Sequence, residues 1–298
     1  MNATLFVLTL SLLSLGAAHA QDAASLRAAH AGLRTKLATS PFQRPLVLES
    51  ALSSGNLKGE VYAVVSQPFG VVSPALQAAG HWCDLLILHV NVKHCGVAGG
   101  APNQTLSLAV GRKVDQSLSD AYLLRFAYRA PVASGDYLRV QMAADAGPLG
   151  TKDYRLALEA VPLDAKTTFI HLSYAYSYGT AALLAMNVYL ASAGRDKVGF
   201  SIVGQGGDGQ PVYIHGVRGV VERNTMRYYL AIESYLGAMS APPGEQEDKR
   251  LRDWFAATER HALQLHEMDL GEYLAMKRIE LQRQHTGQHA DMGNFIQP

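Results

Sequence analysis

The feature that most constrains the fold is a run of short apolar and aromatic segments between residues 105 and 178. Each segment is long enough for a single strand. Turn-forming residues such as Ser134-Gly135-Asp136 and Gly147-Pro148-Leu149-Gly150 separate several of them. Short strands joined by tight turns are typical of an antiparallel meander. We therefore predict antiparallel strands at 105–111, 121–129, 137–143, 153–161 and 167–178.

Helices and hairpins are predicted on both sides of this meander. Before it, the patterns predict a helix at 23–39, a hairpin of strands 46–53 and 58–65, a helix at 74–86 and a strand at 87–92. Ser73 is the expected N-cap of the third of these elements, with Pro74 at its first helical position. After the meander we expect a helix at 180–193, a glycine-turned hairpin of 197–203 and 211–217, and a helix at 220–239.

The last part of the chain reads as a helical extension. Ala241-Pro242-Pro243-Gly244 marks a linker, and 246–284 is charged and helical. Its apolar residues are available for docking: Trp254, Phe255, Leu263, Leu265 and Leu274. One hypothesis for this extension is that it binds a partner protein. The predicted organisation is a leader at 1–20, one domain at 21–240 and the extension at 241–298.

The order of these elements resembles the helix-grip fold of the START-like (SRPBCC-type) superfamily. Two segments carry the resemblance: Val61-Tyr62-Ala63-Val64-Val65, which leads through Val71-Val72-Ser73-Pro74-Ala75-Leu76 to Trp82-Cys83-Asp84, and the helix at 220–239. The resemblance covers about 46–239. It implies an α+β fold in which a curved antiparallel sheet wraps around a long C-terminal helix, with a deep apolar cavity between them. The helix at 180–193 and the extension are additions to the simplest members.

The first twenty residues resemble a secretion signal. Leu5 to Leu15 is an apolar run, and Ala18-His19-Ala20 is the small-x-small pattern of a signal peptidase site. The run is shorter than the roughly 20 apolar residues that span a bilayer. No Lys or Arg precedes it, so a buried N-terminal helix is the alternative. The pattern favours an exported bacterial protein, periplasmic or secreted, with a mature chain that starts near Gln21.

Composition restricts the classes of partner. The formal net charge is +1, so electrostatics gives no support for a nucleic-acid partner. No stretch after the leader has roughly 18 uncharged apolar residues, so no further membrane span is expected. With 48% hydrophobic and 17% charged residues, the chain is typical of globular proteins.

The two cysteines, Cys83 and Cys95, would be oxidised in an exported protein. A disulfide that closes a loop of about a dozen residues would stabilise the fold by roughly 3 kcal/mol. Two buried free thiols are the alternative, because a straight strand at 87–92 would hold the cysteines apart unless Cys83 lies on a helix that folds back. The spacing does not suit a metal site, although His81, His89 and His94 lie nearby.

Candidate ligand-binding residues follow from the alternation of side chains along strands. Tyr122 and Phe126 share one strand face, as do Tyr174 and Tyr176 on another strand. Such a ladder would line a pocket with apolar walls and a few hydroxyl groups, or else pack in an ordinary core. On the helix at 220–239, Asn224, Arg227 and Tyr228 would orient the polar end of a ligand; the alternative is a solvated helix start that includes Glu222.

These features favour an exported, non-catalytic protein that binds a hydrophobic small molecule or lipid, with neither a cofactor nor a metal expected. Neither an HExxH nor a G-x-S-x-G motif is present. The alternative is an enzyme of the cyclase or hydrolase type, in which Arg125, Glu159 or His171 would polarise a substrate. If the helix lines the cavity, Tyr228→Phe should change affinity or stability, whereas Arg250→Ala in the extension should change neither.

Overall fold

The computed structural model describes residues 22–191 and 194–286, and the predicted leader lies outside these ranges. Its centre is a single antiparallel sheet of eight strands in the order β1-β2-β8-β7-β6-β5-β4-β3. The strands are β1 Leu46–Ser53, β2 Asn56–Val65, β3 Val92–Ala98, β4 Asn103–Val110, β5 Tyr122–Ala133, β6 Leu138–Ala146, β7 Thr151–Pro162 and β8 Thr168–Tyr178. The predicted meander is confirmed, because β3 to β8 pair with their chain neighbours throughout.

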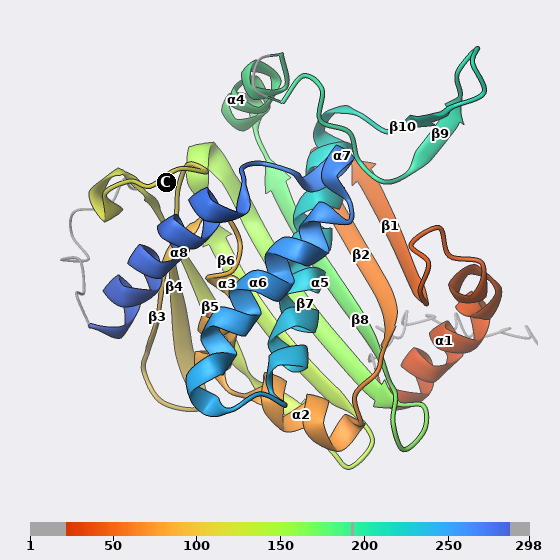
Figure 1. Cartoon of the computed structure of the whole chain (residues 1–298), viewed down its shortest axis with the longest axis vertical. Coiled ribbons are helices and arrows are strands. Elements are labelled where there is room, and N and C mark those ends of the chain that lie inside the picture. The colour runs from red at the N-terminus through yellow and green to blue at the C-terminus, as the bar shows by residue number, and fades with distance from the viewer. Residues whose placement is uncertain (1–21, 192–193, 287–298) are drawn as a thin grey trace, which may run out of the picture.

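Helices cover both faces of this sheet. The long helix α5, Gly216–Ala238, crosses the inner face, and α6, Gln246–Glu259, lies on top of α5 (Figure 1). Helix α1, Ala23–Ala38, packs on the outer face, where Leu26 and Leu37 meet Val161 and Phe169. A curved antiparallel sheet around a long helix is the helix-grip arrangement, so the predicted α+β fold class is confirmed.

Close contact between α5 and the sheet depends on one glycine. A Cβ atom added at Gly59 of β2 would lie 2.1 Å from Oγ1 of Thr225 on α5. The missing side chain therefore lets the helix backbone approach the strand closely. Helix α5 begins four residues earlier than predicted, at Gly216, and most of its side chains are buried.

The predicted helix at 74–86 is two helices. They are α2, Phe69–Gln77, and α3, Ala79–Leu86, separated by the extended backbone of Ala78. Ser73 is therefore not an N-cap, and Pro74 lies inside α2. The break is stable because the Nε1–H group of Trp82 donates to the Leu76 carbonyl at 2.8 Å and satisfies a group at the end of α2.

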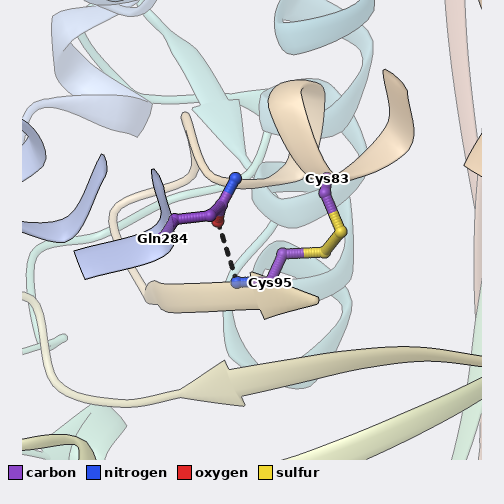
Figure 2. Close-up of a disulfide and its surroundings, with 3 residues drawn as sticks. All are labelled: Cys83, Cys95 and Gln284. Atoms are coloured by element: carbon purple, nitrogen blue, oxygen red, sulfur yellow. Dashed lines mark hydrogen bonds between the residues drawn. A yellow bond between two sulfur atoms is a disulfide. The ribbon is translucent and has the colours of Figure 1, made fainter. Parts of the chain in front are cut away.

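The predicted strand at 87–92 is instead a buried turn, and β3 starts at Val92. The turn reverses the chain, so Cys83 on α3 and Cys95 on β3 have Cα atoms only 5.2 Å apart and are joined by a disulfide (Figure 2). The folded-back helix that a bond required is thus present. Gln284 Oε1 accepts a hydrogen bond from the Cys95 amide at 3.0 Å.

The described part of the extension shares the main core. It comprises the short turn η3 Pro243–Glu245, then α6, α7 Ala262–Leu265 and α8 Leu270–His285. Trp254, Leu265 and Leu274 are buried in the core that also contains α5, whereas Leu263 is 58% exposed. Arg250 pairs with Asp84 and lies 4.2 Å from the Tyr235 ring centroid, so it is not the neutral control position that the sequence predicted.

Two elements project at one end of the sheet (Figure 1). They are helix α4, Thr180–Ala191, and the hairpin of β9 Ile202–Gln205 and β10 Pro211–Tyr213, whose strands are shorter than predicted. The remaining elements are two single turns, η1 Leu118–Asp120 and η2 Pro148–Gly150. Among the described helices, none is both long and apolar enough to cross a membrane.

Candidate ligand cavity

A cavity of about 220 Å³ lies between the inner face of the sheet and α5. Strands β4, β5, β7 and β8 supply one side, with Leu108, Leu124, Tyr154, Tyr174 and Tyr176. Asn224 and Tyr228 face them from α5, and His89 enters from the 87–91 turn. Among the described residues that line the cavity, none is Asp, Glu, Lys or Arg. The cavity is therefore apolar, with a few polar groups that converge in it.

Four tyrosines form an aromatic wall in this cavity. Tyr154 and Tyr176 stack with ring centroids 5.3 Å apart, and Tyr174 meets Tyr228 edge-on at 5.1 Å. Burial raises the pKa of all four phenols, that of Tyr154 to about 12. The hydroxyl groups are therefore neutral at physiological pH and act as hydrogen-bond donors or acceptors. That of Tyr154 is already engaged, since it donates to Thr151 Oγ1 at 2.7 Å.

The polar end of the cavity is His89, whose side chain is buried. Its Nδ1 atom accepts a hydrogen bond from the Asn91 amide at 3.1 Å, which places the proton of the neutral ring on Nε2. The Nε2 atom is buried and has no partner at full hydrogen-bond geometry within the described part of the chain, although the Asn224 side chain interacts with the ring. An unsatisfied buried donor costs about 1–3 kcal/mol, so it is a position where a ligand atom would be stabilised.

The pKa of His89 lies well below its ordinary value. Burial is the main cause, and the positive charges of Arg227, Lys277 and Lys113 act in the same direction. A hydrogen-bonding interaction with the side chain of Asn224, one turn before Tyr228 on α5, raises the pKa to a smaller extent. His89 is therefore a neutral donor at its Nε2 atom, not a cation.

The entrance is bordered by α4 and by the turn between β6 and β7. Ala182 and Met186 of α4 line the cavity beside Pro148 and Leu149 of η2. Leu149 has a φ of +58°, a left-handed conformation in which it lies half exposed at the rim. On α4, the side chains of Leu184 and Val188 point outward and are 66% and 61% exposed.

The structure brings together four of the six residues predicted as ligand contacts: Tyr174, Tyr176, Asn224 and Tyr228. Phe126 faces the same side but lies behind the wall, where its ring meets Tyr154 edge-on at 6.2 Å. Tyr122, the first residue of β5, is half-buried and does not line the cavity.

His89 and Tyr154 line the cavity but were not predicted to do so. The position of Tyr154 could have been predicted from the sequence, because Tyr154 shares a strand face with Leu156 and Leu158. The position of His89 could not, because apolar and polar residues alternate over 87–92 as in a strand.

The residues of the alternative catalytic hypothesis lie elsewhere. His171 and Glu159 are on the outer face of the sheet, where the His171 ring contacts Glu159 at 3.2 Å and Glu60 at 3.0 Å. Tyr137 donates to Glu159 at 2.6 Å in the same cluster. Arg125 is exposed on that face too, because odd-numbered side chains of β5 point away from α5. The hypothesis that these groups polarise a ligand in the cavity is therefore wrong.

The polar start of α5 is buried, contrary to the solvated alternative. Glu222 accepts hydrogen bonds from the Phe200 amide at 2.6 Å and the Ser201 amide at 2.9 Å. Arg227 is directed away from the cavity and bonds to Glu267 and to the Leu265 carbonyl. Glu222 and Arg227 thus hold α5 to its neighbours, and of the polar residues considered on this helix only Asn224 and Tyr228 reach the cavity.

No protein-family model and no curated protein sequence matches the chain. Solved structures with a similar fold include a truncated norcoclaurine synthase from Thalictrum flavum, with 16% identity over 49% of this chain and 89% of that one, at a TM-score of 0.33. The Zhui aromatase/cyclase from a Streptomyces species has 10% identity over 70% and 96%, at 0.32. Human STARD10 has 8% identity over 59% and 77%, at 0.33. At such identities they are similar to this chain in fold alone.

Proposed function

We propose that this protein is an exported binding protein, a carrier or a sensor, that holds a hydrophobic small molecule between the sheet and α5. The observation that supports it is the apolar cavity with its tyrosine wall and its buried histidine donor. Binding sites for small molecules have this composition: mostly apolar walls with a small number of polar groups that fix orientation.

The size of the cavity narrows the class of ligand. An apolar protein cavity of about 150 Å³ holds one benzene molecule. A cavity of about 220 Å³ therefore suits one ring with a short substituent, or a short aliphatic chain, and is too small to enclose a whole phospholipid. The lining favours binding over catalysis, because among the described lining residues His89 is the one side chain with an ordinary pKa near neutrality.

Binding is tested with neutral aromatic compounds and a variant that fills the cavity. Isothermal titration calorimetry with cinnamyl alcohol and methyl cinnamate should show saturable binding to the purified mature protein. Ala182→Phe, at a buried lining position on α4, should abolish it by occupying the space. Ala127→Phe, at an exposed position on the outer face of β5, is the matched control and should bind normally. Absence of binding in the unsubstituted protein would refute this function.

Export is a separate part of the proposal and has its own test. It rests on the apolar run and the Ala18-His19-Ala20 pattern in a segment outside the described residues. The full-length gene expressed in a Gram-negative host should give a periplasmic product that starts at Gln21 by N-terminal sequencing. Retention of Met1 in a cytoplasmic product would contradict export and would leave the cavity hypothesis intact.

A further inference from the structure

One tyrosine of the cavity wall differs from the other three in its hydrogen bonds. Tyr154 donates to Thr151 Oγ1 at 2.7 Å, and Tyr174 and Tyr228 share a hydrogen bond with each other. The hydroxyl group of Tyr176 makes no hydrogen bond to any residue that the structure describes. Three of the four phenols in the wall are therefore satisfied within the protein, and the fourth is not.

The other polar side chains of the lining are engaged as well. The Asn91 side chain donates to the Gly111 carbonyl at 2.6 Å. His89 accepts a hydrogen bond from the Asn91 amide at Nδ1, and its ring also interacts with the Asn224 side chain. Among the described residues that line the cavity, Tyr176 is thus the one polar side chain for which no partner is found in the protein.

The ring of Tyr176 is held firmly in the wall. It stacks on Tyr154 with an interplanar angle of 14°, and its centroid lies 5.6 Å from that of Tyr174. The side chain is only 5% exposed, and burial raises the pKa of its phenol, so the hydroxyl group is neutral at physiological pH. Buried hydroxyl groups in proteins are almost always hydrogen-bonded. A ligand atom in the cavity would supply the bond that this hydroxyl group lacks.

The chemistry of the lining decides which kind of atom this is. A phenol hydroxyl donates one hydrogen, so the atom that satisfies it is an acceptor, such as an oxygen. Among the described lining residues none is Asp, Glu, Lys or Arg, so an ionised ligand would be buried there without a counter-charge, which is unfavourable. The acceptor oxygen therefore belongs to an uncharged group.

We propose that the ligand is a neutral aromatic molecule with an ether, ester or ketone oxygen, and that the Tyr176 hydroxyl group donates a hydrogen bond to that oxygen. This inference rests on the proposed binding function and specifies its ligand class and a residue that positions the ligand. Tyr176 lies two residues before the end of β8, where Tyr178 pairs with Thr151 next to η2. The oxygen would thus lie toward the entrance that α4 and η2 border.

The test uses two neutral compounds that differ at one position, cinnamyl methyl ether and trans-1-phenyl-1-pentene, in which a methylene group replaces the ether oxygen. Their affinities are measured by calorimetry, that of the hydrocarbon by displacement of methyl cinnamate. Tyr176→Phe should lower the affinity for the ether about fivefold and leave that for the hydrocarbon within about twofold, because only the ether loses a hydrogen bond. Tyr122→Phe, at a half-buried position outside the lining, is the matched control and should change neither.

The outcomes separate this inference from the function on which it rests. If both compounds bind and Tyr176→Phe changes their affinities equally, or if Tyr122→Phe gives the same loss, the contact with Tyr176 is overturned and the binding function stands. If neither compound nor methyl cinnamate binds to the unsubstituted protein, the binding function itself is refuted.

The uncharged nature of the ligand has its own test. Cinnamate, which is ionised at neutral pH, should bind at least about tenfold more weakly than methyl cinnamate, because its charge would be buried without a partner. Equal or tighter binding of cinnamate would overturn the assignment of a neutral ligand.

A measurement without any ligand checks the premise. Because the hydroxyl group of Tyr176 has no partner in the described part of the protein, Tyr176→Phe should leave the midpoint of urea denaturation unchanged in the ligand-free protein. A midpoint lowered as much as that of Tyr228→Phe would show that a group of the protein already accepts from Tyr176, and the proposal would fail.

Discussion

Tyr228 shows how a single hydroxyl group contributes to the cavity wall. It faces Tyr174 across the cavity. Burial is the main cause of the raised pKa of both phenols, and a hydrogen bond between the two side chains adds to the raised pKa of Tyr174 while it lowers that of Tyr228. We expect Tyr228→Phe to lower the free energy of unfolding by about 1 kcal/mol, because Tyr174 loses a partner. Urea denaturation measures this. Tyr122→Phe is the matched control, because Tyr122 is half-buried and does not line the cavity; a loss as large as that of Tyr228→Phe would contradict this account.

The His171 cluster predicts a pH dependence on the other face of the sheet. Burial lowers the pKa of His171, but hydrogen bonds to Glu159 and Glu60 outweigh it and raise the pKa above the ordinary 6.5. Burial likewise opposes the ionisation of Glu60, yet bonds from His171 and Lys58 bring its pKa from 4.5 to about 2. The histidine contribution is complete below pH 6.5 and is lost as the pH rises through its folded-state pKa. The Glu60 contribution is present above pH 4.5 and is lost as the pH falls toward 2.

The pair therefore stabilises the fold most between about pH 4.5 and 6.5. We expect the melting temperature of His171→Gln to fall below that of the unsubstituted protein mainly in this window, with the difference shrinking as the pH rises through the raised folded-state pKa of His171. Thermal unfolding followed by circular dichroism at a series of pH values measures this. A difference that is constant from pH 5 to 9 would show that His171 acts through packing and not through charge.

At the scale of elements, the 87–91 turn explains why part of the site could not be predicted. Leu88, Val90 and Val92 alternate with His89 and Asn91 as in a strand, and neither Gly nor Pro interrupts them. The turn forms because its carbonyl groups find donors far away in the chain. Tyr273 donates to Leu88, and Lys277 donates to His89. Such long-range contacts cannot be predicted from the local sequence pattern. The inward-facing side chains of β5, β7 and β8, in contrast, could be predicted, because one sheet face is buried and the side chains alternate with period two.

A substitution at Lys277 tests whether these long-range contacts stabilise the 87–91 turn. It is fully buried, donates to the carbonyls of His89 at 2.7 Å and Val92 at 2.9 Å, and pairs with Glu280. Lys277→Met should lower the free energy of unfolding by about 2–6 kcal/mol, because it leaves two buried carbonyl groups without a donor at about 1–3 kcal/mol each. Glu280 keeps its ion pair with Lys93 in this variant. Lys249→Met is the matched control, since its pair with Asp253 is largely exposed and contributes about 0.5 kcal/mol or less. Similar unfolding midpoints in guanidinium for the two variants would contradict this role.

At the scale of the whole molecule, the helical extension completes the core. Its helices were predicted from the sequence, but its apolar residues were expected only to be available for docking. In the structure Trp254 stacks on Tyr273 with ring centroids 5.2 Å apart, and its indole N–H donates to the Arg227 carbonyl of α5. Helix periodicity reveals an apolar stripe, but it does not show which surface covers that stripe. The partner of this stripe is α5 of the same chain, and a second protein is not needed to bury it.

Trp254→Ala should therefore destabilise the entire protein and not only the extension. We expect a loss of about 3–5 kcal/mol, as for other large aromatic deletions in cores, with a single transition by fluorescence and circular dichroism. Leu263→Ala, at a 58% exposed position of the same segment, should have almost no effect. Two separate transitions in Trp254→Ala would indicate that the extension folds as its own unit.

The covalent bridge from α3 to β3 has one more consequence. The chain segment that it closes, between Cys83 and Cys95, contains His89, so the same dozen residues are restrained by the bridge and contribute to the lining of the cavity. Order that the bridge already imposes does not have to be supplied by binding energy. Thiol oxidation and cavity occupancy are therefore thermodynamically linked, and the linkage is reciprocal. The reduced protein should bind its ligand more weakly, and a bound ligand should protect the bridge from reductants to the same extent in free energy.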